Sequence, residues 1–246
     1  LVPIALFGVI GIVASQGLFF ESISRIDVAL ALVIVYTAPI PVAAYQRLRL
    51  GEILPMKAYL GMLIAIVGVA MAALGGSGGI SDVDGVGLAF AFATMLAYAV
   101  QVVLAARQPA ALPPLARTGA SMLVAAICWM AIVPVWTLPF DVLDALEPLQ
   151  GRIDVEVPVW VAVVWVIVFG SIVPYLLLIV GAPRIGPGAT SIVTMAEPIV
   201  AAFVAWLALG QSLTAVEVVG IAVALVAIAY VERVRMRRLR GIPAGA

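Results

Sequence analysis

The chain contains one long internal repeat at a constant offset. Residues 11–72 overlay residues 170–231 without a gap, at an offset of 159 positions. The matched pairs are Gly11 with Gly170, Arg25-Ile26 with Arg184-Ile185, Pro39-Ile40 with Pro198-Ile199, Leu48 with Leu207, Leu50-Gly51 with Leu209-Gly210, Leu54 with Leu213 and Gly61 with Gly220. A constant offset over three apolar segments indicates duplication of one multi-segment unit, so the fold must accommodate two related copies.

The composition is that of a membrane protein. Hydrophobic residues make up 65% of the chain and charged residues 11%, and the mean hydropathy is +1.24. A soluble domain is about a quarter charged. The formal net charge is zero, so no basic surface for nucleic acid is expected.

The residue types that support most catalysis and metal binding are scarce. The chain has no histidine, and its one cysteine, Cys128, lies in an apolar run. Its one lysine, Lys57, is placed near a predicted helix end. We therefore expect no catalytic residues, no metal site, no cofactor and no enzymatic activity.

Eight segments are long and apolar enough to cross a bilayer, which takes about 20 residues each. The first has no basic stretch before it and no small-residue cleavage site, so it is interpreted as a helix rather than a signal peptide. A short surface helix is predicted near Asp141–Leu149, in an acidic connection. The predicted spans are 1–20, 28–46, 58–75, 86–106, 118–138, 159–181, 187–208 and 214–232.

The basic residues predict the orientation in the membrane. A C-terminus in the cytoplasm places all basic residues except Arg25 and Arg152 on the cytoplasmic side, as the positive-inside rule requires. Five arginines follow the last span, at Arg233, Arg235, Arg237, Arg238 and Arg240. We expect an integral protein of the bacterial plasma membrane, with the lipid bilayer as its main partner and an oligomeric state that the sequence leaves open.

The repeat and the orientation together predict an inverted repeat. Equivalent spans are five apart, and because five is odd the two copies cross the membrane in opposite senses. The fold class is therefore an all-α membrane protein with eight spans of a five-plus-five, ten-helix bundle. The second copy begins near Val86, so the offset of 159 places the start of the first copy about 70–80 residues before Leu1, and two further spans are expected there. A natural eight-helix protein is the alternative.

The domain boundaries follow from the same repeat. Residues 1–75 form the incomplete first copy, 76–85 a Gly-rich linker, 86–232 the complete second copy and 233–246 a basic cytoplasmic tail. The Gly-rich stretch has no Gly-Lys-Ser/Thr after it, so it is not interpreted as a phosphate-binding loop.

Several motifs resemble those of the EamA family of the drug/metabolite transporter superfamily. The second copy has Glu197-Pro198, then Leu209-Gly210-Gln211-Ser212-Leu213-Thr214, then Gly220; the first copy has Pro39, Leu50-Gly51-Glu52 and Gly61. Gln211 departs from the glutamate usual in that family. The resemblance implies a ten-helix secondary carrier that moves small metabolites without ATP, commonly by export.

Glu197 is the strongest candidate for a functional residue. It is the only carboxylate well inside a span, where an ionisable group costs about 2.5–3.5 kcal/mol to insert. Thr190, Thr194 and Glu197 lie on one helix face by their spacing. We interpret Glu197 as binding a proton or the cationic part of a substrate; a protonated carboxyl that holds two helices together is the alternative.

Other polar residues within the spans are weaker candidates for substrate or proton binding. They are Thr94, Tyr98, Gln101, Gln16, Tyr36, Thr37, Ser171 and Tyr175. Each could equally join helices by hydrogen bonds. Pro39, Pro198 and Pro174 are candidate hinges, since proline removes a helical hydrogen bond.

The sequence therefore predicts a secondary active transporter that exports small amino-acid-like or drug-like metabolites by alternating access, with a proton as a possible coupling ion. A non-transporting partner subunit or an inactive fragment is the alternative. Substrate identity, direction and coupling ion remain open at this stage, although the lack of an embedded basic residue argues against a strongly anionic substrate.

Overall fold

The protein is mostly helical. The computed structural model describes residues 2–51, 55–74, 84–109, 111–137, 140–143, 145–148, 156–197, 199–200 and 214–239. Five of its helical stretches are long and apolar enough to cross a membrane: Val2–Ile23, Val28–Arg49, Gly85–Ala106, Pro114–Ile132 and Val159–Ala196. Two shorter apolar helices are Met56–Met71 and Ala215–Val231. An all-α membrane protein is therefore confirmed at this level.

The first part of the chain forms two interrupted helices and one regular helix. The first is interrupted by a π-helical segment and the second by a turn at residues 36–38. Their elements are α1 (Val2–Leu6), η1 (Phe7–Ala14), α2 (Ser15–Ile23), α3 (Val28–Val35), α4 (Pro39–Leu50) and α5 (Met56–Leu74).

The remaining part repeats this arrangement after two further helices. Its elements are α6 (Gly85–Ala106), α7 (Pro114–Ile132), the 3₁₀ turns η2 (Val135–Thr137) and η3 (Phe140–Val142), the strands β1 (Leu146–Pro148) and β2 (Glu156–Pro158), then α8 (Val159–Trp165), η4 (Val166–Ile172), α9 (Val173–Val193), η5 (Thr194–Ala196) and α11 (Ala215–Leu239). Of the predicted span 187–208, residues 187–197 and 199–200 are helical, and residues 198 and 201–208 lie outside the described residues.

The acidic connection differs from the predicted surface helix near Asp141–Leu149. Its described part instead contains the turn η3 and an antiparallel strand pair, with Glu147 opposite Val157. Pro148 and Pro158 end the two strands, and a proline inside a helix would remove a backbone donor. Pro134 likewise explains why α7 ends at Ile132, earlier than the predicted 138, because the residue before a proline disfavours helical geometry.

Element boundaries recur at the offset of the sequence repeat. The π-helical segments begin at Phe7 and Val166, and α5 and α11 begin at Met56 and Ala215; both pairs are 159 residues apart. The turn at 36–38 likewise corresponds to the 3₁₀ turn η5, within one residue. The repeated residues therefore adopt matching interruptions as well as matching helices.

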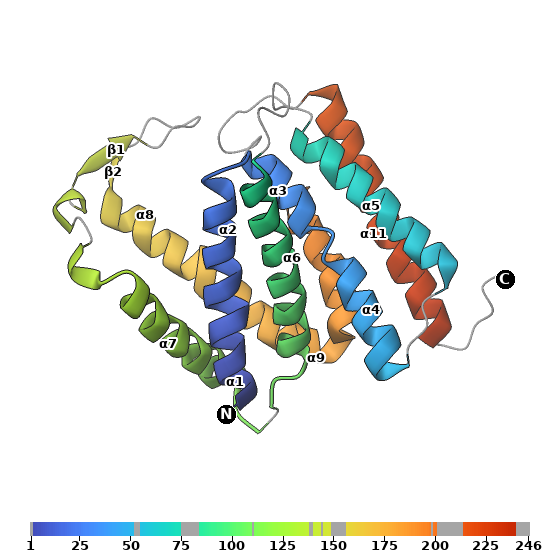
Figure 1. Ribbon diagram of the computed structural model, residues 1–246, viewed down its shortest axis with the longest axis horizontal. Coiled ribbons are helices and arrows are strands. Elements are labelled where there is room, and N and C mark those ends of the chain that lie inside the picture. Colours follow the sequence, from blue (N-terminus) through green and yellow to red (C-terminus); the bar gives the residue numbers. More distant parts are fainter. Residues whose placement is uncertain are drawn as a thin grey trace.

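Helices α5 and α11 pack closely and run in opposite directions along one edge of the molecule (Figure 1). Their interface is built from small and medium apolar side chains that include Ala65, Val69, Ala224 and Val231. A Cβ on Gly68 would lie 2.5 Å from the backbone nitrogen of Ala224. Glycine at this position therefore allows the two backbones to approach.

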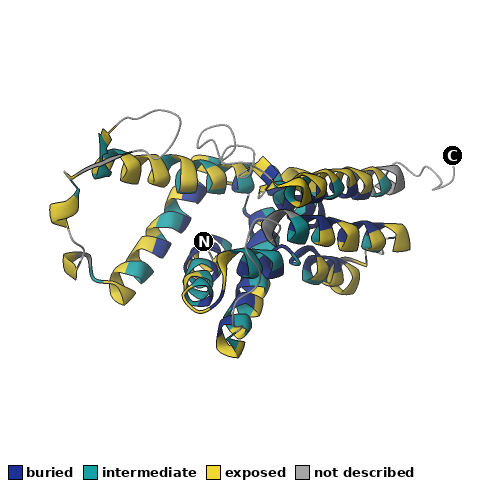
Figure 2. Ribbon diagram, turned by 90° about the horizontal axis from the view of Figure 1, so that it is seen from above, coloured by how far each residue is buried: buried dark blue, intermediate teal, exposed yellow. Residues whose placement is uncertain are grey.

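Basic residues gather at one end of the helix bundle. The C-terminal ends of α4, α6 and α11 and the first turns of α5 and α7 lie at the lower side of Figure 1. Basic residues occur at or next to these helix ends, at Arg47, Arg49, Lys57, Arg107, Arg117 and Arg233. We call this the basic end of the bundle. At the opposite side, α8 is exposed along most of its length, as the yellow residues of Figure 2 show.

Candidate functional site

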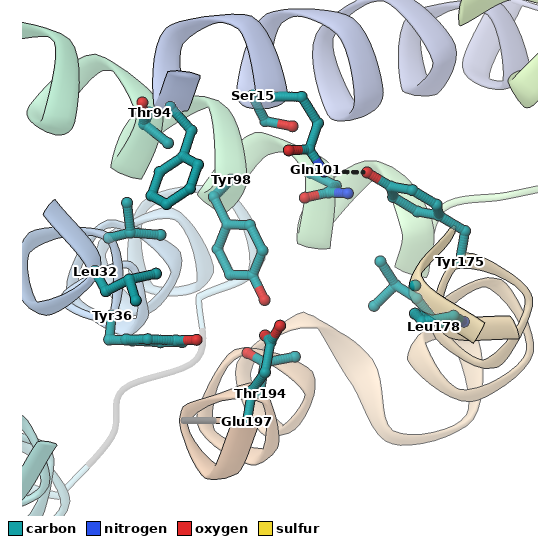
Figure 3. A pocket seen from close by; sticks show the side chains of 15 residues that line it. Ser15, Leu32, Tyr36, Thr94, Tyr98, Gln101, Tyr175, Leu178, Thr194 and Glu197 are labelled. Carbon is teal, nitrogen blue, oxygen red and sulfur yellow. Dashed lines mark hydrogen bonds between the residues drawn. The ribbon is translucent and has the colours of Figure 1, made fainter. Parts of the chain in front are cut away.

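A pocket of about 270 Å³ lies where α2, α3, α6, α9 and η5 meet. Figure 3 shows side chains from all these elements directed into it. Its polar lining residues are Ser15, Gln16, Tyr36, Thr94, Tyr98, Gln101, Tyr175, Thr194 and Glu197. The pocket therefore combines residues from both ends of the sequence with residues of α6.

Glu197 follows directly on the 3₁₀ turn η5, in helical geometry, and lines the pocket. The Tyr36 side chain, which comes from the break between α3 and α4, lines the pocket beside Glu197 (Figure 3). The Tyr98 hydroxyl of α6 points toward the Glu197 carboxylate (Figure 3). Two helix interruptions and α6 thus converge on one acidic group.

A second polar group lies on the opposite wall. The Gln16 amide donates to the Tyr175 hydroxyl over 3.4 Å, and Gln101 lines the same part of the pocket. Phe7 holds the Tyr175 ring edge-on, with ring centroids 6.1 Å apart. Gly11 lies against Gln101, since a Cβ there would be 3.1 Å from the Gln101 Cγ. The first helix therefore packs closely on the stem of the buried Gln101 side chain.

The charged side chains that line the pocket are of one sign. Among the described residues, Glu197 is the pocket's one carboxylate, and no lysine or arginine lines it. The neighbouring donors are neutral hydroxyls and amides. A carboxylate that has neutral donors and no cation around it offers a site for a positively charged group.

The structure brings most of the predicted site residues together, but not all of them. Thr190, Thr37 and Ser171 do not line the pocket. The hydroxyls of the first two donate to their own helices, Thr190 to the Gly186 carbonyl at 2.8 Å and Thr37 to the Ile34 carbonyl at 2.6 Å. Such local bonds are common for threonine in helices and do not decide which residues reach the pocket, since Thr94 and Thr194 also bond to their own helices and do line it. Spacing assigns residues to one face of a helix but does not show which part of that face borders the pocket.

One of the predicted hinge prolines lines the pocket and another does not. Pro174 lines the pocket, whereas Pro39 is buried at the start of α4 and does not. Pro198 lies outside the described residues.

Sequence reasoning also missed six lining residues, which are Ser15, Phe19, Leu32, Val35, Gly170 and Leu178. Ser15 adjoins Gln16 in the sequence, but the apolar residues look like lipid-facing ones and gave no signal.

On the basic side of the pocket, α4 packs on α9 and α6. The Gln46 side chain is almost fully buried and presses on Gly188, where a Cβ would overlap its carboxamide. Tyr45 and Arg107 join α4 to the end of α6 by a cation–π contact of 5.3 Å. We call the Gln46–Gly188 packing the basic-side closure.

Comparison with known proteins extends these observations. The model of the EamA-like transporter family matches residues 1–74 and 85–233. One crystal structure aligns with 97% of this chain and 78% of its own, at a TM-score of 0.75 and 18% identity, and is among 21 matching solved chains. At that identity it shows the fold alone. No protein of curated function matches in sequence. The family match covers nearly the whole chain, which therefore belongs to the EamA-like transporter family.

Proposed function

We propose that this chain is a secondary active carrier that exports small amino-acid-like or drug-like metabolites by alternating access, with Glu197 at the centre of the substrate site. The observation that carries the proposal is the position of Glu197. It is an accessible carboxylate in a pocket between interrupted helices from both parts of the chain. Interrupted helices near the middle of the membrane form the sites of many transporters.

The lining favours substrates that bear an amine or another cation. Glu197 supplies the negative charge, and the rings of Tyr36, Tyr98 and Tyr175 supply aromatic faces that attract cations. The amides of Gln16 and Gln101 offer both donors and acceptors, which suits the remaining polar groups of a zwitterion. The same carboxylate is available to a proton when the substrate is absent, which is the basis for proton coupling.

An inverted repeat of five helices supports alternating access. The antiparallel pairing of α5 with α11 and the matched π-helical segments are both expected of such a repeat. The first copy has Ala38 at the position equivalent to Glu197. The two copies therefore differ in charge at the site, and the acidic group belongs to the second copy alone.

The arrangement supports an outward-open conformation. In the proposed topology the basic end and the C-terminus lie in the cytoplasm, following the positive-inside rule. The basic-side closure then separates the pocket from the cytoplasm. Toward the other end, Val166, Ile167 and Phe169 of η4 are exposed although they point in different directions around the helix. In this proposal, export requires the side of the pocket near η4 to tighten while the Gln46–Gly188 packing opens.

A screen in cells tests the function. Cells that express the protein are challenged with amino acids, nucleosides and cationic drugs at toxic concentrations. We expect protection against amine-bearing compounds by the wild type and by Glu217→Gln, a matched change outside the pocket, and none by Glu197→Gln. Equal protection by Glu197→Gln, present in the membrane at the same level, would contradict the proposal.

A further inference from the structure

A second hollow lies on the outer face of the α5–α11 pair, away from the central pocket. It has a volume of about 630 Å³, within the range of small-molecule sites, and is lined almost entirely by apolar side chains. Leu60 and Ile64 form one wall and Val226 the other, and all three are exposed. We call this hollow the α5–α11 groove.

The groove exists because the two helices approach on their inner faces. A Cβ on Gly61 would lie 2.5 Å from the Val231 side chain, and Gly68 lies against the backbone of Ala224. Ala222 and Ala227 add no bulk at the groove floor. Small residues therefore bring the backbones together and leave a furrow between the larger side chains at the rim.

Polar groups are confined to the basic end of the groove. Lys57 is in the first turn of α5 and Tyr230 is near the C-terminal end of α11, and because the helices are antiparallel both lie at the same end. Arg233 follows Tyr230 by three residues and so continues the groove-lining face of α11. Among the described residues no aspartate or glutamate lines the groove.

We propose that the α5–α11 groove binds one anionic phospholipid of the cytoplasmic leaflet, independently of what the central pocket transports. An acyl chain occupies the apolar furrow, and the phosphate lies between Lys57 and Arg233. Tyr230 lies at the level of the headgroup, where tyrosine is enriched. Basic pockets between helices on the cytoplasmic side suit anionic headgroups, because the charge and the apolar chain are recognised together.

The charge pattern favours a lipid over a second copy of the chain. A twofold dimer through this groove would pair like surfaces, so the cations at one end of each groove would face their counterparts or unpaired apolar surface. A phospholipid matches both parts of the groove at once. Dimerisation is therefore an outcome that the experiment must be able to detect.

Native mass spectrometry of the delipidated, purified protein tests the proposal, since it reports bound lipids and the number of protomers. Phosphatidylglycerol and phosphatidylcholine with identical acyl chains are titrated separately, and inorganic phosphate is added as a competitor. We expect the wild type to prefer phosphatidylglycerol by at least about fivefold, the factor that one cation near the membrane surface supplies. Lys57→Gln should remove most of this preference, and Arg184→Gln, at the same end but outside the groove, should leave it unchanged.

A groove-filling variant tests the apolar half of the site. Ala222→Trp should weaken binding of both lipids severalfold, whereas Leu225→Trp, on the same helix but outside the groove, should not. Equal binding of the two lipids, an equal effect of Lys57→Gln and Arg184→Gln, or unchanged binding by Ala222→Trp would overturn the proposal. Full displacement by inorganic phosphate, or a dimer that loses the lipid site, would also overturn it.

Discussion

The Gln16 amide donates to the Tyr175 hydroxyl across the central pocket, and the two residues are separated by 159 positions, which is the offset of the sequence repeat. Equivalent positions of the two copies thus meet face to face. Such a contact is expected at a pseudo-twofold axis, where each copy contributes the same helix to the site. The pocket is therefore placed where the copies meet.

Removal of this contact should weaken substrate binding more than folding. Tyr175→Phe deletes the hydroxyl and Gln16→Leu deletes its donor, and each should raise KM severalfold with the protein still inserted. A double-mutant cycle on thermal stability should give a coupling of about 0.6 kcal/mol, typical of hydrogen bonds between membrane helices. A coupling near zero, with additive effects on KM, would show that the contact does not contribute.

The basic-side closure predicts an effect of Gly188→Ala. The added methyl group overlaps the Gln46 carboxamide, so α4 must move away from α9. We expect a loss of about 1–3 kcal/mol of stability, the usual cost of overpacking. Gln46→Ala should rescue it in the double variant. Gly119→Ala in α7 has open space around its Cβ and serves as the control, with little change in unfolding temperature. Wild-type stability of Gly188→Ala would contradict the observed packing.

The α5–α11 interface should be equally sensitive at Gly68. A Cβ there meets the backbone of Ala224, which cannot move without separating the helices. Gly68→Ala should therefore lower stability by about 1–3 kcal/mol. Gly181→Ala in α9, where nothing lies within 4 Å of the added Cβ, provides the comparison in the same unfolding assay. A smaller effect of Gly68→Ala than of Gly181→Ala would argue against this packing.

An exposed contact at the other end of the bundle should matter little. Arg25 donates to Glu21 at 2.7 Å and lies 3.8 Å from Asp84, the residue that caps α6. The bond to Glu21 raises the pKa of Arg25, so the guanidinium keeps its charge and the contact would be lost only at extremely alkaline pH. Because solvent and salt screen exposed pairs, Arg25→Gln should leave the unfolding temperature nearly unchanged from neutral to mildly alkaline pH. A large drop would show that the contact holds the α2–α3 corner.

Much of the helical arrangement could be predicted from the sequence because apolar length and the repeat are strong signals. The starts of α5 and α11, for example, differ by the offset that the sequence shows. Other features could not be predicted, because they depend on local interactions that the pattern of residue types does not show. The described part of the acidic connection forms a strand pair in which both strands end in proline, and Thr190 does not line the pocket although Thr194, one turn further along, does. The pocket's leucines and valines could not be distinguished from lipid-facing ones, since both environments are apolar.

The most direct test is counterflow of a radiolabelled substrate, identified by the cellular screen, in liposomes that contain the purified protein. Wild type, Glu197→Gln and Glu217→Gln are reconstituted at equal density. We expect Glu217→Gln to exchange substrate at the wild-type rate and Glu197→Gln to lose at least about tenfold in rate, equivalent to about 1.4 kcal/mol of binding or barrier free energy. Undiminished exchange by Glu197→Gln would show that the carboxylate in the pocket is not part of the substrate site.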